Sequence, residues 1–254
     1  MDLGLKGKRV LVTGGTKSIG RAIVDTFVAE GAIVGFCARD AAMVTQREGE
    51  WRNSGAKVTG RALDVTDSAR LKAWIDGFAR DNEGIDHFVA NVSALGSPNT
   101  AEGWRNAVEV DLLSTVNALS YVQPYLEQSA PGSTACVLGT VALVEVSNPT
   151  SPYRSVKAAL TPLVKSLAID LAPKGVRYNM VSPGTIIEDG NTWGRQRDAN
   201  TPRYQDSMKR NPMGRMGSPQ EIANTVVFLA SERSSFTTGA NIMIDGAITK
   251  RIQY

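Results

Sequence analysis

The sequence predicts an α/β fold in which a mostly parallel, doubly wound sheet of seven strands carries helices on both faces. Short β-branched or apolar runs alternate with longer amphipathic runs along the whole chain, and this alternation is typical of repeated βαβ units. The 254 residues are 42% hydrophobic, enough to bury one large core. No repeat or low-complexity linker divides the chain, so we expect one domain over residues 1–254.

The predicted strands are short apolar runs, as expected for strands buried on both faces. They cover residues 8–13, 32–38, 56–64, 85–91, 133–140, 176–182 and 240–245. The amphipathic runs between them predict helices over residues 19–30, 40–54, 67–82 and 101–128, with later helices beginning near residues 152 and 219.

Two segments depart from this alternation. Pro162 lies inside the helix that begins near residue 152, where it removes an N–H donor and crowds the carbonyl of Ala158, so we expect a kink. Residues 185–212 are rich in Asn, Asp, Arg, Gly and Pro and show no clear period. Such a long loop is either a functional lid or a disordered connection, and we predict a substrate lid.

The composition excludes several classes of partner. With 28 basic and 25 acidic side chains the net charge is +3, which favours an anionic ligand but is far below a nucleic-acid-binding signature. Cys37, Cys136 and the single histidine, His87, have no zinc-ligand spacing, so we expect no metal site. The chain has no long apolar segment, and we expect a cytoplasmic protein with no membrane partner.

A glycine-rich turn, "VLVTGGTKSIGRAI", follows the first strand and opens the first helix. Glycines there would let the backbone approach a pyrophosphate, which then meets the unpaired N–H groups of the helix. Such a turn also occurs in ordinary strand-to-helix connections. Its position after the first strand favours a dinucleotide site.

Tyr153 and Lys157 are four residues apart at the start of a predicted helix. Residues with this spacing share one helix face, so the pair could address one bound substrate and cofactor. The spacing also arises by chance in helices where the tyrosine packs and the lysine is solvated.

In their context these motifs resemble those of the classical short-chain dehydrogenase/reductase family. Thr13, Gly14, Ile19 and Gly20 match its T-G-x-x-x-G-I-G loop, with Ser18 in place of the middle glycine, and Tyr153 and Lys157 match its Y-x-x-x-K motif. Similar stretches at residues 63–65, 176–185 and 211–247 extend the resemblance nearly end to end, and it implies a single-domain Rossmann fold. The family's N-N-A-G after the fourth strand reads Ala90, Asn91, Val92 and Ser93 here.

The resemblance implies a nicotinamide cofactor. Ala38 occupies the position where NAD enzymes commonly place an acid. Arg39 follows it and Lys17 lies in the glycine-rich loop, and two cations near the expected 2′-phosphate favour NADP(H), although both could be solvated loop charges. The side chain of Ser18 would strain the loop or add a hydroxyl contact. The cofactor-binding positions implied are Gly14, Thr16, Lys17, Ser18, Ile19, Gly20, Arg39, Asp64, Val65, Asn91, Tyr153, Lys157, Pro183, Gly184 and Ile186.

The resemblance also implies catalytic roles. Tyr153 would give its phenolic proton to a carbonyl oxygen, and Lys157 would bind ribose hydroxyls and lower the tyrosine pKa. Thr140 stands thirteen residues before the tyrosine, in the place of the family's serine, and Asp111 replaces an asparagine. Ionised aspartate only accepts hydrogen bonds. It could make the lysine more basic and the tyrosine less activated, hold a relay water with a shifted pH optimum, or face elsewhere.

We therefore predict an NADPH-dependent reductase of a small carbonyl compound, or the reverse alcohol dehydrogenase. The alternative is an NADP(H)-binding regulatory or scaffold protein, because several positions depart from the family pattern. The resemblance implies a homotetramer and leaves the substrate open. It places Leu95, Val141, Leu143, Glu145 and the lid at the substrate pocket, where the lid arginines Arg195, Arg197 and Arg203 could clamp an anion or be solvated.

Overall fold

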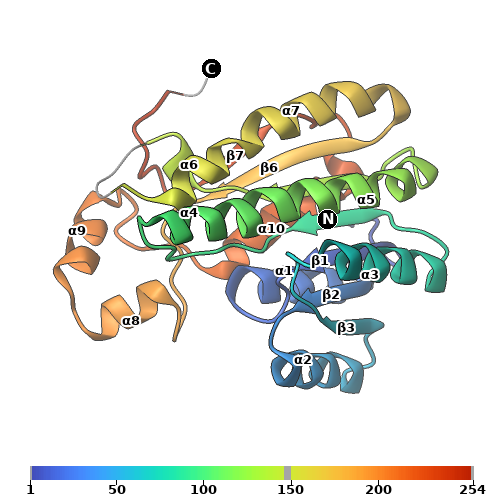
Figure 1. Cartoon of the computed structure of the whole chain (residues 1–254), viewed down its shortest axis with the longest axis horizontal. Coiled ribbons are helices and arrows are strands. Elements are labelled where there is room, and N and C mark those ends of the chain that lie inside the picture. The colour runs from blue at the N-terminus through green and yellow to red at the C-terminus, as the bar shows by residue number, and fades with distance from the viewer. Residues whose placement is uncertain (1, 146–149, 253–254) are drawn as a thin grey trace.

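One sheet of seven strands forms the centre of the molecule (Figure 1). The computed structural model describes residues 2–145 and 150–252. The strand order is β3-β2-β1-β4-β5-β6-β7, and every neighbouring pair is parallel. The predicted doubly wound α/β fold is therefore confirmed. The strands are β1 (Arg9–Thr13), β2 (Ile33–Ala38), β3 (Val58–Ala62), β4 (His87–Ala90), β5 (Thr134–Leu138), β6 (Arg177–Pro183) and β7 (Asn241–Ile244).

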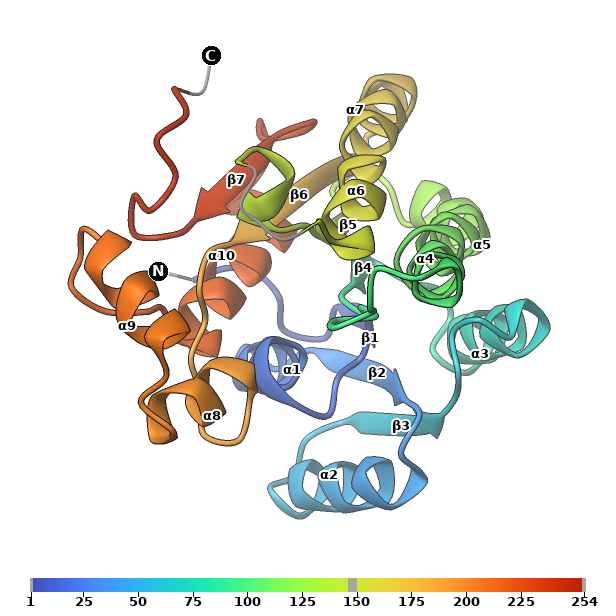
Figure 2. The same cartoon turned by 60° about the vertical axis from the view of Figure 1, so that its left-hand side comes forward.

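Helices cover both faces of the sheet because each strand is followed by a crossover. On one face, α1 (Ser18–Ala29), α2 (Ala41–Asn53) and α10 (Pro219–Ala230) enclose one apolar core. On the other face, α3 (Ser68–Asp81), α5 (Ser114–Gln128) and α7 (Leu160–Leu171) enclose a second core. Figure 2 shows α3, α5 and α7 along this second side. The central strands β4, β5 and β6 are buried throughout, as strands between two helical layers must be.

Side-chain caps explain where several helices begin. Asp40 accepts a hydrogen bond from the Met43 amide before α2, and Asp67 accepts one from the Arg70 amide before α3. Ser218 and Glu221 form a reciprocal capping box at α10. Each cap pairs an N–H group that the helix itself leaves unpaired, so these boundaries follow from local sequence.

The helix predicted over residues 101–128 is not one continuous α-helix. It consists of α4 (Ala101–Ala107), a π-helical segment η1 (Val108–Leu113) and α5. A π-helical turn inserts an extra residue into the helical repeat and so changes which side chains face inward. Asp111, in η1, is 0% exposed.

The predicted kink before Pro162 is confirmed. The helix α6 (Pro152–Ala158) ends and α7 begins at Leu160, with Ala159 between them. Because Pro162 has no N–H to donate to Ala158, the helical hydrogen-bond ladder is interrupted there.

Residues 185–212 contain two short helices, so the prediction of a segment without regular structure is wrong. They are α8 (Thr192–Asp198) and α9 (Pro202–Arg210), and Figures 1 and 2 show them at one end of the molecule. Asn191 caps α8 through the Gly194 amide, and Thr201 caps α9 with Pro202 in its first turn. Three short 3₁₀ turns complete the described structure: η2 (Val141–Leu143), η3 (Ala172–Lys174) and η4 (Glu232–Ser234).

The direction in which the chain crosses the sheet reverses between β1 and β4. The chain moves from β1 outward to β2 and β3, and then returns to β4 on the other side of β1. In sheets of this type, ligands bind beyond the carboxyl ends of the strands at such a switch point. Among the described helices, none is long and apolar enough to cross a membrane.

Candidate active site

The glycine-rich loop lies at the switch point and is tightly fixed. The amides of Gly14 and Gly15 donate to the carbonyl of Cys37, at 2.8 and 3.1 Å. Gly14 has a φ of +73°, and a Cβ added at Gly20 would lie only 2.0 Å from the Gly14 oxygen. The side-chain amide of Asn91 donates to the carbonyls of Thr13 and Gly14, each at 3.1 Å. Asn91 therefore braces this loop from β4.

The start of α1 is open to an anion. Lys17 precedes the helix with an extended backbone, and no described side chain caps it. Its first N–H groups could therefore meet a phosphate, and the tight packing of Gly20 against Gly14 holds the loop beside them. These features fit the pyrophosphate of a dinucleotide. Ser18 has a φ of +47°, so the expected strain is present and costs about 1 to 2 kcal/mol relative to glycine.

Arg39 and Asp64 lie at the expected adenosine end of the site, after β2 and β3. Arg39 and Lys17 are exposed, so both are accessible to a ligand phosphate. Asp64 accepts hydrogen bonds from the amide and the hydroxyl of Thr66. Although burial alone would raise the pKa of Asp64, these bonds and the charge of Arg39 hold that pKa below its usual value. Val65 is buried beside it in the core.

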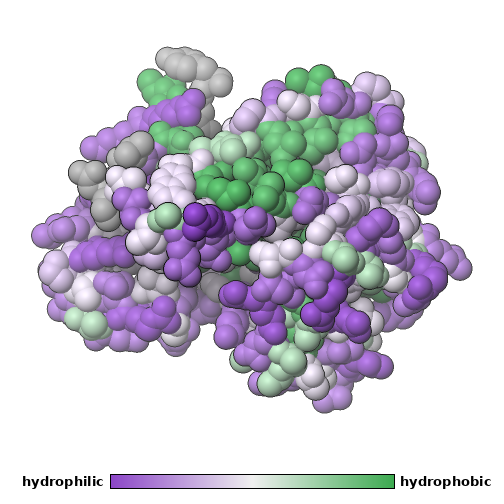
Figure 3. All heavy atoms as spheres, viewed as in Figure 1, coloured by the Kyte–Doolittle hydropathy of each residue, from purple (hydrophilic) through white to green (hydrophobic). Residues whose placement is uncertain are grey.

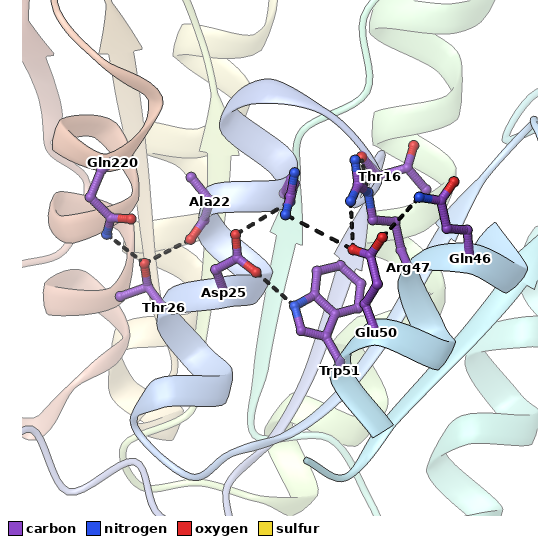
Figure 4. A network of polar contacts seen from close by, with 10 residues as sticks. Thr16, Ala22, Asp25, Thr26, Gln46, Arg47, Glu50, Trp51 and Gln220 are labelled. Carbon is purple, nitrogen blue, oxygen red and sulfur yellow. Dashed lines mark hydrogen bonds and ion pairs between the residues drawn. The ribbon is translucent and has the colours of Figure 1, made fainter. Parts of the chain in front are cut away.

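A third cation, which sequence reasoning missed, reaches the same loop. Arg47, on α2, donates to the carbonyl of Thr16 at 3.4 Å and pairs with Glu50 at 2.5 Å (Figure 4). Glu50 also lies 3.9 Å from Arg21 of α1. These contacts tie α1 and α2 to the glycine-rich loop. No local motif predicts the contact of Arg47 with Thr16, because the two positions are 31 residues apart.

The Tyr153 and Lys157 side chains lie one turn apart on α6, as their spacing predicts. Pro152 is the first residue of α6, where the missing N–H costs no hydrogen bond. Thr140 follows β5, and its hydroxyl accepts a hydrogen bond from the Ala142 amide at 3.2 Å. The Thr140 hydroxyl is also close enough to the Tyr153 phenol to lower its pKa. The structure thus brings the three predicted catalytic side chains together.

Burial dominates the proton affinity of Tyr153. Burial, together with a smaller effect of the negative charge of Asp111, raises the pKa of Tyr153 to about 12. The hydroxyls of Thr140 and Ser93 act in the opposite direction. The tyrosine is therefore held in its protonated, proton-donating form.

Asp111 points at Lys157 and not away from it. The Lys157 Nζ atom lies 3.3 Å from Asp111 Oδ1, and the two side chains are 2% and 0% exposed. Nζ also contacts the carbonyl oxygens of Leu138 at 3.1 Å and Val92 at 3.4 Å. Burial lowers the pKa of Lys157, whereas Asp111 raises it. Asp111 thus opposes the effect of burial, which still leaves the pKa of Lys157 below its usual value.

Ser93 is a site residue whose role sequence reasoning missed. It follows β4, and its Oγ atom is buried without a hydrogen-bond partner among the described residues. The only sequence signal was a hydroxyl residue where the family pattern has glycine.

Pro183, Gly184 and Ile186 lie at the carboxyl end of β6. The Gly184 amide donates to the Ile244 carbonyl at 2.9 Å, and a Cβ at Gly184 would lie 2.7 Å from the Cα of Asp245. Ile186 forms a bridge with Gly217. Beside these residues a hollow of about 110 Å³ lies at the base of the lid rather than at Tyr153, lined by Thr185, Ile186, Met213, Arg215, Gly217, Glu221, Ile244, Asp245 and Gly246.

The lid arginines already have partners within the lid. Arg197 pairs with Asp189 and Asp198, at 2.9 and 2.8 Å. Arg195 donates to the carbonyl of Gly190, and Arg203 stacks over Trp193 at 5.1 Å. These contacts favour a structural role over an anion clamp.

The expected substrate side is largely apolar. Val141 and Leu143 of η2 are partly buried next to Thr140, whereas Leu95 is exposed. Glu145 accepts a hydrogen bond from the Lys250 amide at 3.1 Å, which attaches the C-terminal segment to this side of the site. Among the described residues, no group of three His, Cys, Asp or Glu side chains is arranged to hold a metal ion.

Comparison with known proteins agrees with this geometry. A family model described as enoyl-(acyl carrier protein) reductase matches residues 14–249. Isoepoxydon dehydrogenase patN of Penicillium expansum is 33% identical over 261 residues, covering 100% of this chain and 99% of that protein. Sorbose reductase SOU1 of Candida albicans is 32% identical over 254 residues, covering 96% and 88%.

A solved structure matches over nearly the same extent. The L-sorbose reductase of Gluconobacter frateurii, complexed with NADPH and L-sorbose, superposes with a TM-score of 0.90 at 25% identity, covering 99% of this chain and 100% of that one. The matches span almost the whole chain. The chain belongs to the classical short-chain dehydrogenase/reductase family of oxidoreductases.

Proposed function

We propose that the protein is an NADPH-dependent reductase that converts a small carbonyl compound to an alcohol, or runs in reverse. The observation that carries this proposal is the meeting of Tyr153, Lys157 and Thr140 beside a glycine-rich loop suited to a pyrophosphate. The cofactor supplies the hydride. Tyr153 gives its phenolic proton to the carbonyl oxygen, and Thr140 hydrogen-bonds that oxygen and orients it.

Two cations support NADP(H) as the cofactor. Lys17 and Arg39 are exposed at the mouth of the site. A 2′-phosphate pairs well with such groups. The NADPH present in the structure of the Gluconobacter relative agrees with this assignment.

Several further assignments belong to this proposal. We propose one domain over residues 1–254, of which 1, 146–149 and 253–254 lie outside the described residues. Residues 185–212 act as a substrate lid. Cys37 and Cys136 are unpaired and buried, which supports a reducing, cytoplasmic location.

We also propose a homotetramer. Figure 3 shows an apolar patch on the face that carries α5 and α7. Leu113, the last residue of η1 before α5, is 40% exposed and Ile169, on α7, is 64% exposed. Such a surface suits burial between copies of the chain. Light scattering that gives only the monomer mass of 27.2 kDa would contradict this assembly.

The regulatory alternative has one supporting observation. Lys157 is engaged by Asp111 in a closed pair, which could oppose its role toward ribose and Tyr153. A protein of that kind would bind NADPH without turning substrate over.

The deciding experiment measures initial rates of NADPH oxidation with a panel of carbonyl compounds, comparing the wild type with Tyr153→Phe. The panel contains L-sorbose, cyclic ketones, aromatic ketones and keto acids. We expect turnover of at least one compound and a loss of more than about 100-fold in Tyr153→Phe, within the range typical of general acid catalysis. NADPH binding without any tyrosine-dependent turnover would support the regulatory alternative.

A further inference from the structure

The loop after β4 carries an unpaired hydroxyl at the centre of the site. Ser93 Oγ is buried and has no hydrogen-bond partner among the described residues. A buried polar group without a partner destabilises the folded state. The glycine that the family pattern has at this position would avoid that cost. A role in the reaction therefore accounts for Ser93 better than a contribution to the stability of the fold.

The backbone on either side of Ser93 is held in place. The Val92 carbonyl accepts a hydrogen bond from Lys157 Nζ at 3.4 Å, and the Ala94 amide donates to Asp111 Oδ2 at 3.2 Å. Lys157 and Asp111 contact each other at 3.3 Å. The buried ion pair thus fixes the loop on both sides of Ser93, and the hydroxyl projects from a rigid support.

Ser93 lies beside the part of α6 that carries Tyr153, because Lys157, one turn after Tyr153, contacts the adjoining Val92 carbonyl. Ser93 and Thr140 are the two hydroxyl residues close enough to Tyr153 to lower its pKa, against burial and Asp111, which raise it. Thr140 has a second task, because its oxygen also accepts from the Ala142 amide and is expected to meet the substrate. The Ser93 hydroxyl has no competing partner.

We propose that Ser93 is a further catalytic residue, which donates a hydrogen bond to the Tyr153 oxygen once that oxygen has lost its proton, and that Asp111 positions it through the Ala94 amide. The inference rests on the proposed reductase function. In the reductive direction, the carbonyl carbon receives a hydride and the Tyr153 proton moves to the carbonyl oxygen. Tyr153 is left as a phenolate, and Ser93 stabilises it while keeping its own proton. Oxidation of the alcohol uses the same contact in reverse.

The ionisable side chains around the proposed contact between Ser93 and Tyr153 belong to few elements. Lys157 belongs to α6 and Asp111 to η1, while Arg154 of α6 is partly buried. Three further ionisable side chains on neighbouring elements are exposed, namely Glu102 and Arg105 on α4 and Glu109 on η1. Glu145, after η2, is exposed and bound to the Lys250 amide. Asp111 is the charge that acts on Tyr153 in this structure, so Ser93 offsets its effect.

The test is Ser93→Ala, with Ser97→Ala as the matched control. Ser97 lies in the same loop, but its hydroxyl is already used, donating to the Ala94 carbonyl and accepting from Asn106. In Ser93→Ala we expect kcat/KM for reduction to fall roughly 3- to 10-fold, as for one lost hydrogen bond. The pH midpoint of kcat for alcohol oxidation should rise by about 0.5 to 1 pH unit.

Two further measurements distinguish a catalytic role of Ser93 from a structural one. Removing an unpaired hydroxyl should leave the melting temperature unchanged or raise it, and the Kd for NADPH should stay within about twofold. Ser97→Ala should lower the melting temperature and leave the pH midpoint in place.

The outcomes distinguish this inference from the proposed function. A Ser93→Ala variant with wild-type kcat/KM and an unmoved pH midpoint, in an enzyme that depends on Tyr153, would overturn the role of Ser93 alone. Absence of Tyr153-dependent turnover in the wild type would overturn both proposals.

Discussion

At the scale of single residues, the most unusual feature of the site is its buried ion pair. Asp111 and Lys157 are almost fully shielded from solvent, where a lone charge would be strongly disfavoured. Pairing with Asp111 raises the pKa of Lys157 against the effect of burial, but it also offsets the positive charge that would otherwise lower the tyrosine pKa. Of the three interpretations that the sequence leaves open, the 3.3 Å contact with Lys157 contradicts the one in which Asp111 faces elsewhere. The charge of Asp111 acts toward a more basic lysine and a less activated tyrosine, although burial still leaves the pKa of Lys157 below its usual value.

The variant Asp111→Asn tests this interpretation. Asparagine keeps an oxygen that can accept from the Ala94 amide but removes the negative charge that raises the pKa of Tyr153. The phenolate then forms more readily. We expect the pH midpoint of kcat for alcohol oxidation to fall by roughly 0.5 to 1 pH unit, opposite to the change in Ser93→Ala. Identical pH profiles for Asp111→Asn and the wild type would contradict the interpretation.

At the scale of elements, the contact between α2 and the glycine-rich loop makes a separate prediction. Arg47→Gln removes the guanidinium that donates to the Thr16 carbonyl and pairs with Glu50. The loop loses one side of its support (Figure 4). Because the support acts on the pyrophosphate region, NADPH and NADH should both bind roughly 3- to 10-fold more weakly, with kcat at saturating cofactor unchanged.

Arg39→Ala and Arg52→Gln are the comparisons for this prediction. Arg39 is exposed where a 2′-phosphate is expected, so its loss should weaken NADPH binding and leave NADH binding in place. Arg52 is on the same helix as Arg47 but pairs with Glu48 at 3.4 Å on the exposed side, and its loss should change neither affinity. Fluorescence titration with NADPH and with NADH measures the two affinities of all three variants. A loss confined to NADPH in Arg47→Gln would assign Arg47 to the 2′-phosphate instead.

The elements also show what the sequence could and could not predict. All seven strands were predicted, and the central strands β4, β5 and β6 gave the clearest signal because parallel strands buried on both faces are nearly continuous apolar runs. The π-helical turn at 108–113 was not predicted, since one extra residue barely disturbs the helical periodicity of the sequence. The helices within residues 185–212 were missed because they are only 7 and 9 residues long, too short for a clear helical period in the sequence.

Part of the candidate site was likewise predictable from the sequence, and part was not. Tyr153 and Lys157 were predicted from their spacing and Thr140 from the family resemblance, and the three lie together in the structure. The Ser93 environment and the Arg47 contact depend on segments that meet only after folding, and sequence spacing carries no information about them.

At the scale of the whole molecule, one buried histidine links folding to pH. His87 lies on β4, and its Nδ1 atom is 3.0 Å from the Thr134 hydroxyl on β5. Its Nε2 atom is buried without a described partner. Burial lowers the pKa of His87 to about 3, so the folded protein holds this side chain neutral at pH values where the unfolded chain would protonate it.

The sign of the effect follows from that difference. The unfolded chain binds a proton at His87 near pH 6.5 and the folded chain only near pH 3, so the free energy of unfolding is highest above pH 6.5 and falls as the pH decreases toward 3. The limiting slope is about 1.4 kcal/mol per pH unit. His87 is the only histidine of the chain, and few other groups change their charge between pH 5 and 7.

His87→Asn should remove this dependence. Asparagine can still hydrogen-bond the Thr134 hydroxyl but does not titrate. The variant leaves a smaller side chain in the core and should be less stable than the wild type at pH 7. Urea unfolding at pH 7, 6 and 5, at one protein concentration because subunit assembly would make stability concentration-dependent, compares the slopes. The wild type should lose roughly 1 to 2 kcal/mol between pH 7 and 5, and the variant much less. Equal losses in the two proteins would mean that His87 is not held neutral by the fold and that another group accounts for the acid sensitivity.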